Sequence, residues 1–243
     1  MKKHLSAFIF SLAIIVASAL LGNAFINRHQ KSGTIDVTGL GQQNFTSDLI
    51  VWEGNFSRES FDIKSAYSEL EKDRQAVTKY LNSKGIPSEN IVFNAVNTNP
   101  LYEQNYSSSG NYMGQTFKGY QLQQSLQIES RDVETVEQIS REITELLIQG
   151  VRFYSQSPRY YYTQLESLKI EMISKATEDA RLRAERIAEN SGASLGKLIS
   201  ANMGIFQITG QNSTEDYSWG GTFNTSSKEK TASITMRLSY AVR

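Results

Sequence analysis

The sequence predicts an α+β domain preceded by one N-terminal apolar helix. Two observations support this fold class. Stretches that alternate polar and apolar residues, typical of strands, are separated by three stretches with helical periodicity. Ahead of them all, Leu5 to Ile26 contains no charged residue. We therefore expect two parts, an apolar leader over residues 1–29 and a folded domain over residues 30–243.

The leader begins with Met1-Lys2-Lys3-His4, a positive start typical of exported proteins. As a helix, Leu5–Ile26 would span about 33 Å at ~1.5 Å per residue, enough for a bilayer core. We expect an uncleaved signal anchor. Cleavage as a signal peptide is the alternative, after Ala17-Ser18-Ala19 or the weaker site Gly22-Asn23-Ala24. A buried core helix is the third, and either of the first two outcomes exports the domain.

The sequence of the first half of the domain predicts a strand, a helix and a second strand. After a polar linker over 30–33, Thr34–Gly39 opens the folded part, and Leu49–Arg58 alternates like a strand. From Asp62, a residue that can cap a helix, the period becomes helical until Gly85 and Pro87 stop it. A further strand is expected over Ile91–Asn97.

The second half repeats this order after a polar stretch, Asn99 to Phe117, which we expect to be a long loop. Gly119–Glu129 alternates regularly, Asp132 opens a helix that Gly150 closes, and Val151–Tyr162 returns to strand. Strand–helix–strand, hairpin and strand–helix–strand make the βαββαβ order of a ferredoxin-like core. The elements expected after this core are a third helix at Leu165–Asn190 and two strands, Lys197–Ile208 and Thr231–Val242, joined by the loop Gln211–Ser227.

The third predicted helix carries an alanine every four residues: Ala176, Ala180, Ala184 and Ala188. Small residues at this spacing let another helix or a sheet approach closely. One interpretation is an ordinary amphipathic helix that packs within the domain. The other is a helix that forms an oligomer, which makes the four alanines candidate self-association residues.

Composition excludes several classes of chemistry and partner. Lysine plus arginine equal aspartate plus glutamate at 25 each, and the chain beyond residue 31 holds 21 basic and 25 acidic residues. A weakly acidic domain is a poor nucleic-acid binder, so we expect no such partner. The chain has no cysteine, and its two histidines, His4 and His29, both flank the apolar segment. We therefore expect no cofactor, no metal site and no catalytic triad in the domain.

Paired carboxylates are the remaining route to acid–base catalysis. The pairs Glu142 with Glu145 and Glu178 with Asp179 lie on helix faces predicted to be polar, so we interpret them as solvated surface charge. Gly39-Leu40-Gly41 resembles half of a phosphate-binding loop, but no Gly-Lys-Ser/Thr sequence follows it, and we expect a turn between strands. No catalytic residue is predicted, and we expect the chain not to be an enzyme.

Aromatic residues concentrate in the polar stretch between residues 99 and 117. Tyr102, Tyr106, Tyr112 and Phe117 stand there among Ser, Asn and Gly, a composition typical of recognition surfaces. Tyr160-Tyr161-Tyr162 has a similar character. Loops of this length are usually either functional or disordered. We keep both interpretations, a contact site for a subunit or ligand and a mobile hairpin tip.

Three segments resemble the SIMPL-domain family. Residues 34–49, TIDVTGLGQQNFTSDL, look like its opening strand pair, although Ser47 stands where the family usually has Pro. Gly119-Tyr120 leading into Ser125–Ile128 is similar to its second hairpin, and the alanine stretch up to Gly192 and Leu198 matches best. The resemblance covers residues 34–242. It implies a periplasmic or membrane-anchored bacterial envelope protein, with some members forming ring-like assemblies or linked to oxidative-stress defence, and no agreed enzymatic activity.

Two functional hypotheses follow from the sequence. The first is a homo-oligomeric structural or stress-related protein, tethered by Leu5–Ile26 to the periplasmic face of the inner membrane, or free in the periplasm if the leader is cleaved. The second is a periplasmic binding module that recognises a small ligand, a glycan or a protein partner through the tyrosine-rich stretch 99–117.

Overall fold

The computed structural model describes residues 11–23, 33–215 and 218–243. Residues 11–23 are helical, and the rest of the predicted span Leu5–Ile26 lies outside the described residues. In the part that is described, no helix is long and apolar enough to cross a membrane.

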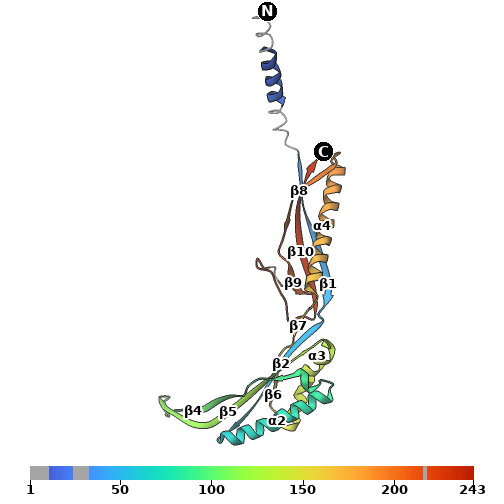
Figure 1. Ribbon diagram of the computed structural model, residues 1–243. Helices are drawn as coiled ribbons and strands as arrows, with labels where there is room; N and C mark the ends of the chain where they lie inside the picture. Colours follow the sequence, from blue (N-terminus) through green and yellow to red (C-terminus); the bar gives the residue numbers. More distant parts are fainter. Residues whose placement is uncertain (1–10, 24–32, 216–217) are drawn as a thin grey trace, which may run out of the picture. The chain divides into compact units, whose positions relative to one another are not determined.

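The chain forms two compact units and is α+β, as predicted (Figure 1). Unit 1 comprises Met1–Gly41, Ile173–Gly204 and Ile234–Arg243, and unit 2 comprises Gln42–Met172 and Ile205–Ser233. The elements in chain order are β1 (Thr34–Thr46), β2 (Leu49–Ser60), α2 (Ile63–Ser83), η1 (Ser88–Asn90), β3 (Ile91–Phe93), β4 (Asn97–Tyr106), β5 (Tyr112–Ser130), α3 (Val133–Glu142), η2 (Ile143–Gln149), β6 (Phe153–Ser155), β7 (Arg159–Tyr161), α4 (Leu165–Asn190), β8 (Leu195–Met203), β9 (Gln207–Gly210) and β10 (Glu229–Val242).

Unit 2 is built on a sheet whose strands run antiparallel in the order β3-β5-β2-β6, with β4 added to β5 and β7 to β2. Helices α2 and α3 cover one face of this sheet (Figure 1). β1 and β10 belong to a second sheet. The sequence did not indicate that the strands divide into two sheets. The ferredoxin-like arrangement stays a prediction, while the antiparallel sheet with its helices is observed.

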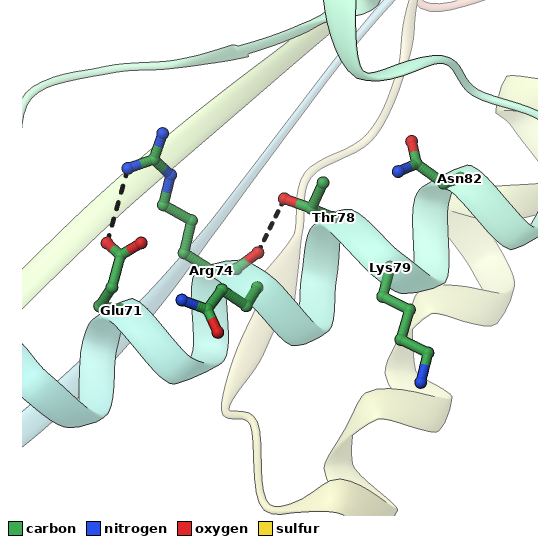
Figure 2. A pocket seen from close by; sticks show the side chains of 6 residues that line it. Glu71, Arg74, Thr78, Lys79 and Asn82 are labelled. Atoms are coloured by element: carbon green, nitrogen blue, oxygen red, sulfur yellow. Dashed lines mark hydrogen bonds and ion pairs between the residues drawn. The ribbon is translucent and has the colours of Figure 1, made fainter.

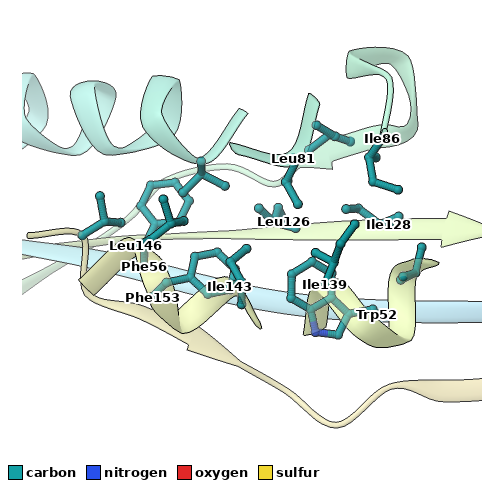
Figure 3. Close-up of a cluster of buried hydrophobic side chains, with 14 of the residues drawn as sticks. Trp52, Phe56, Leu81, Ile86, Leu126, Ile128, Ile139, Ile143, Leu146 and Phe153 are labelled. Carbon is teal, nitrogen blue, oxygen red and sulfur yellow. The ribbon is translucent and has the colours of Figure 1, made fainter. Parts of the chain in front are cut away.

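The core of unit 2 fills the space between sheet and helices (Figure 3). Trp52 and Phe56 of β2 have no exposed surface, and Phe153 packs against both rings, at centroid distances of 5.9 and 6.3 Å. The Trp52 indole N–H, which burial would otherwise leave without water, donates to Ser155 Oγ at 3.0 Å. Burying side chains as large as these stabilises unit 2, because it removes apolar surface from water.

Both predicted helix caps are confirmed. Asp62 accepts the N–H of Ser65 at the start of α2, and Asp132 accepts the N–H of Thr135 at the start of α3. Gly150, with φ of 75°, ends the helical stretch as predicted, although its last turns over 143–149 are 3-10 rather than α. These signals act over a few residues, which is why the sequence reveals them.

The stretch Asn99 to Phe117, predicted as a loop, forms most of a β-hairpin. β4 pairs with the first half of the 19-residue strand β5, and a short turn at 107–111 joins them. No residue of β4 is buried. Because neither face of β4 enters a core, its sequence lacks the alternation that marks a half-buried strand, and the prediction was wrong for this reason.

Unit 1 contains an antiparallel sheet in the order β1-β10-β8, with α4 packed against one face (Figure 1). Gly39 lies inside β1, so the predicted turn at Gly39-Leu40-Gly41 is not formed. Glycine is needed because α4 crosses here: a Cβ at Gly39 would lie 2.1 Å from the Ala176 carbonyl oxygen. The backbones of α4 and β1 approach more closely here than a side chain at position 39 would allow.

Candidate functional site

The hairpin β4–β5 carries an exposed aromatic surface, which we call the aromatic hairpin. It brings together the four predicted recognition residues in two edge-to-face pairs, Tyr102 with Phe117 at 5.7 Å and Tyr106 with Tyr112 at 5.9 Å between ring centroids. The three tyrosines are more than half exposed. Edge-to-face contact is a preferred geometry of aromatic pairs, so the four rings form two contacting pairs on an exposed surface.

Two further aromatic residues extend the Tyr102–Phe117 pair. Phe61, which follows β2, and Tyr120 of β5 contact the Phe117 ring at centroid distances of 5.4 and 5.2 Å. Phe61 is 71% exposed. Neither residue was predicted, because Phe61 reaches the hairpin only through the pairing of β2 with β5, and no local sequence signal reports that contact.

Backbone geometry also shapes the aromatic hairpin. The register shifts between Leu101 and Tyr102, leaving Lys118 as a bulged residue beside Gly119. Gly119 has φ of 123°, and a Cβ there would lie 2.4 Å from the Ser60 carbonyl oxygen. The bulge and the glycine let the strand pass close to the end of β2. The hairpin then continues as two strands without a helix against it (Figure 1).

The tyrosine triplet at 160–162 is partly buried, with Tyr161 and Tyr162 half-exposed. Tyr160 is buried in unit 2, and burial together with the nearby Glu137 carboxylate raises the pKa of its phenol. Tyr162 packs against Phe45 at 4.7 Å between centroids. Tyr160 and Tyr162 therefore contribute to packing within their unit.

Two of the carboxylates considered for acid–base chemistry, Glu142 and Asp179, are held by hydrogen bonds and ion pairs. Glu142 accepts the Lys84 ammonium at 2.8 Å, and this hydrogen bond lowers the pKa of Glu142. Asp179 accepts the backbone N–H of Leu40 at 2.8 Å and pairs with Arg183 at 3.0 Å, so its pKa is lowered too. A carboxyl that acts as a general acid near neutral pH needs the opposite shift. In residues 11–23, 33–215 and 218–243, no three acidic or histidine side chains gather as metal ligands.

A shallow depression on the outer face of α2 carries mixed charges (Figure 2). Arg74 lies within 3.5 Å of Glu71 and over the Phe93 ring, and Thr78 donates its hydroxyl to the Arg74 carbonyl. Its lining residues, which all come from this one helix, are Glu71, Arg74, Gln75, Thr78, Lys79 and Asn82. A single helix face without a buried polar group gives little basis for ligand binding.

The alanines predicted as self-association candidates lie inside unit 1. Ala176, Ala180, Ala184 and Ala188 are all buried, against the face of the sheet that contains Gly39. They occupy the place that the packing interpretation gives them and are not exposed to a second chain. The exposed strand of this unit is β8, where every residue from Lys197 to Met203 faces solvent.

The family model of SIMPL, described as a protein of unknown function (DUF541), matches residues 35–240. The chain belongs to the SIMPL family. The match begins in β1 and ends in β10, so it covers the aromatic hairpin, α4 and β8. Among curated proteins, none matches this chain.

One lysine of the SIMPL domain is buried. Lys230 of β10 is 1% exposed, and its ammonium donates to the Tyr160 carbonyl oxygen. Burial lowers the pKa of Lys230 to about 8, and the charge of Glu215 offsets only part of this effect. The Glu215 carboxylate is itself held by the Gly210 N–H and by the Asn224 amide.

Because Lys230 is buried, we expect the free energy of unfolding of the domain to depend on pH. An unfolded lysine has a pKa near 10.4, so between pH 8 and 10 the unfolded chain binds more protons than the native one, and stability rises with pH. We expect Lys230→Met to be more stable than the wild type by about 1–3 kcal/mol at pH 7, an advantage that shrinks toward pH 10. Urea unfolding at both pH values measures it.

The matched control is Lys228→Met. Lys228 bonds Glu134 and Glu137, both at 2.9 Å, and these bonds raise its pKa. Lys228→Met should destabilise the domain, and the loss of free energy of unfolding at pH 7 should equal the loss at pH 9. A Lys230→Met advantage that stays constant from pH 7 to pH 10 contradicts the argument.

Proposed function

We propose that this SIMPL protein is an exported, non-catalytic envelope protein that self-associates and works by contact with other molecules. The apolar leader of the sequence supports export, either to the periplasmic face of the inner membrane or to the periplasm after cleavage. A structural or stress-related role agrees with the family resemblance. The lowered pKa values of Glu142 and Asp179 favour contact over acid catalysis.

One observation carries this proposal: each unit leaves a long strand exposed at the edge of its sheet. β4 in unit 2 contains no buried residue, and β8 in unit 1 contains none either. Both strands display large apolar side chains, aromatic in β4 and aliphatic in β8. Exposed strand edges of this kind pair readily with further strands, and monomeric proteins usually protect them.

Light scattering on residues 30–243 tests the self-association. The expected particle has at least twice the mass of one chain at micromolar concentration. N-terminal sequencing of the protein recovered from cells tests export: an intact Met1 in the membrane fraction indicates an anchor, and a new N-terminus after Ala19 or Ala24 indicates cleavage. Intact protein found only in the cytosol contradicts the proposal.

A binding module is the second candidate, favoured by the aromatic hairpin. Tyrosine-rich surfaces recognise glycans, small ligands and proteins with little loss of side-chain entropy. Thermal shift against envelope ligands, compared between the wild type and a chain that lacks Ser107–Gly114, separates this function from the first. Self-association that survives the deletion, together with loss of a ligand-induced shift, would establish binding as the task of the hairpin.

A further inference from the structure

The sheet of unit 1 has two edges, and one of them, β1, is blocked at Leu40. The Val242 N–H donates to the Gly33 carbonyl. In an antiparallel pair the backbone groups of successive residues point to opposite sides. At the start of β1 the backbone N–H and C=O groups of odd-numbered residues therefore point toward β10, and those of even-numbered residues point outward. The outward N–H of Leu40 is taken by the Asp179 carboxylate of α4 at 2.8 Å. A further strand cannot bond β1 at this position, because α4 already occupies it.

The other edge, β8, is open. Gly204 donates its N–H to the Thr235 carbonyl, and the register continues regularly from Met203 opposite Met236 to Ser200 opposite Ser239. By the same alternation, the backbone groups of Ala201 and Met203 point away from β10. Within the described residues, β8 pairs with no strand except β10.

The open edge also has an uncovered apolar face. Leu198, Ala201 and Met203 lie opposite Tyr240, Leu238 and Met236, three buried residues of β10. They therefore share the face on which α4 lies, but α4 leaves them exposed: Leu198 is 50% and Met203 61% exposed. An edge strand with unpaired backbone groups and apolar side chains on one face fits an added strand of the same kind.

A second copy of β8 is a strand of that kind. In antiparallel pairing about a two-fold axis near Ala201, each strand places its own apolar side chains beside those of the other. Lys197 is the single charged residue of β8, and this pairing separates the two copies of Lys197 by about 27 Å at ~3.4 Å per residue, beyond the Debye length. Like charges therefore do not oppose the contact, and the bulges of β8 lie outside the regular part from Ser200 to Met203.

We propose that the β8 edge, centred on Ala201, is the surface through which two copies of this chain pair, strand against strand, into one continuous sheet. The proposal rests on the self-association proposed above and names the surface that carries it. The contact is isologous: each copy contributes the same residues.

The absence of cysteine in the chain allows a direct test. Single cysteines are placed at each position from Ile199 to Met203 in the full-length chain, and mild oxidation in detergent is followed by a non-reducing gel. A disulfide needs Cα atoms within about 7 Å, so only positions near the two-fold axis cross-link to themselves. The dimer band is expected to be strongest at Ala201→Cys, about tenfold above the band of Thr38→Cys on the exposed face of β1.

A second variant tests the same edge without cross-linking. Ala201→Pro removes an outward N–H while leaving the bonds to β10 in place, and we expect it to raise the dissociation constant of the dimer about tenfold or more. Deletion of Ser107–Gly114 is the control at the other open edge and should leave the dimer unchanged. Circular dichroism confirms that both variants fold.

Each result decides the proposal. Cross-linking near Ala201 together with dissociation by Ala201→Pro supports it. A wild-type chain that self-associates, but cross-links at no β8 position and is unaffected by Ala201→Pro, overturns the assignment of the surface and leaves the proposed function standing. A monomeric wild type overturns both.

Discussion

Replacing Gly39 by alanine is expected to unfold or loosen unit 1, at a cost of about 3 kcal/mol or more. The added methyl group would lie 2.1 Å from the Ala176 carbonyl oxygen and 2.4 Å from the Ala180 nitrogen. Both atoms belong to the backbone of α4, so no side-chain rotation relieves the overlap and the helix itself must move. Urea unfolding, followed by hydrogen exchange of the α4 amides, measures the loss.

Gly33→Ala is the matched control, at the residue that directly precedes the same strand. A Cβ at Gly33 meets only the Val242 side chain, at 3.7 Å, which is ordinary contact. Ala180→Gly should not rescue Gly39→Ala, because the backbone overlap remains. If Gly39→Ala and Gly33→Ala change the free energy of unfolding equally, the close approach of α4 to β1 is wrong.

Replacing Asp73 by alanine is expected to destabilise unit 2 by about 3–5 kcal/mol. The Asp73 side chain is 4% exposed and accepts two hydrogen bonds from Arg58, from Nε at 2.5 Å and from Nη2 at 2.7 Å. Arg58 also donates to the Gly150 carbonyl at 2.8 Å, so one guanidinium joins β2, α2 and the end of η2. Losing the carboxylate leaves a partly buried cation without its counter-charge.

A double substitution separates the value of this pair from the cost of breaking it. Arg58→Met with Asp73→Leu removes both charges and keeps comparable volume, so it should cost clearly less than Asp73→Ala alone. Denaturant midpoints of the three proteins give the comparison. Equal destabilisation by the single and double variants means that packing, rather than the unpaired charge, accounts for the loss.

The sequence revealed those features that depend on neighbouring residues. Asp62 and Asp132 were recognised as caps because a cap bonds an N–H three residues ahead. β2 and the inner half of β5 were recognised because one of their faces enters the core around Trp52 and Leu126. β4 was missed because it is exposed on both faces, and its Asn, Gln and Tyr residues resemble a loop.

Other features depend on which distant segments meet. The alanine spacing in α4 indicated a close approach but not its partner, and the glycine that receives the helix, Gly39, lies 137 residues before Ala176. The aromatic pairs of the hairpin followed only in part from composition, since Phe61 joins them through strand pairing. The open edge of β8 follows from the strand order of the sheet, and periodicity carries no information about strand order.

Sedimentation of residues 30–243 across a dilution series tests the account most directly. The exposed strand edges β4 and β8 predict a reversible assembly, whose sedimentation coefficient falls toward that of a single chain only on dilution. In Ala201→Pro the sedimentation coefficient should begin to fall at a higher protein concentration. A single, concentration-independent species with the mass of one chain would contradict the account.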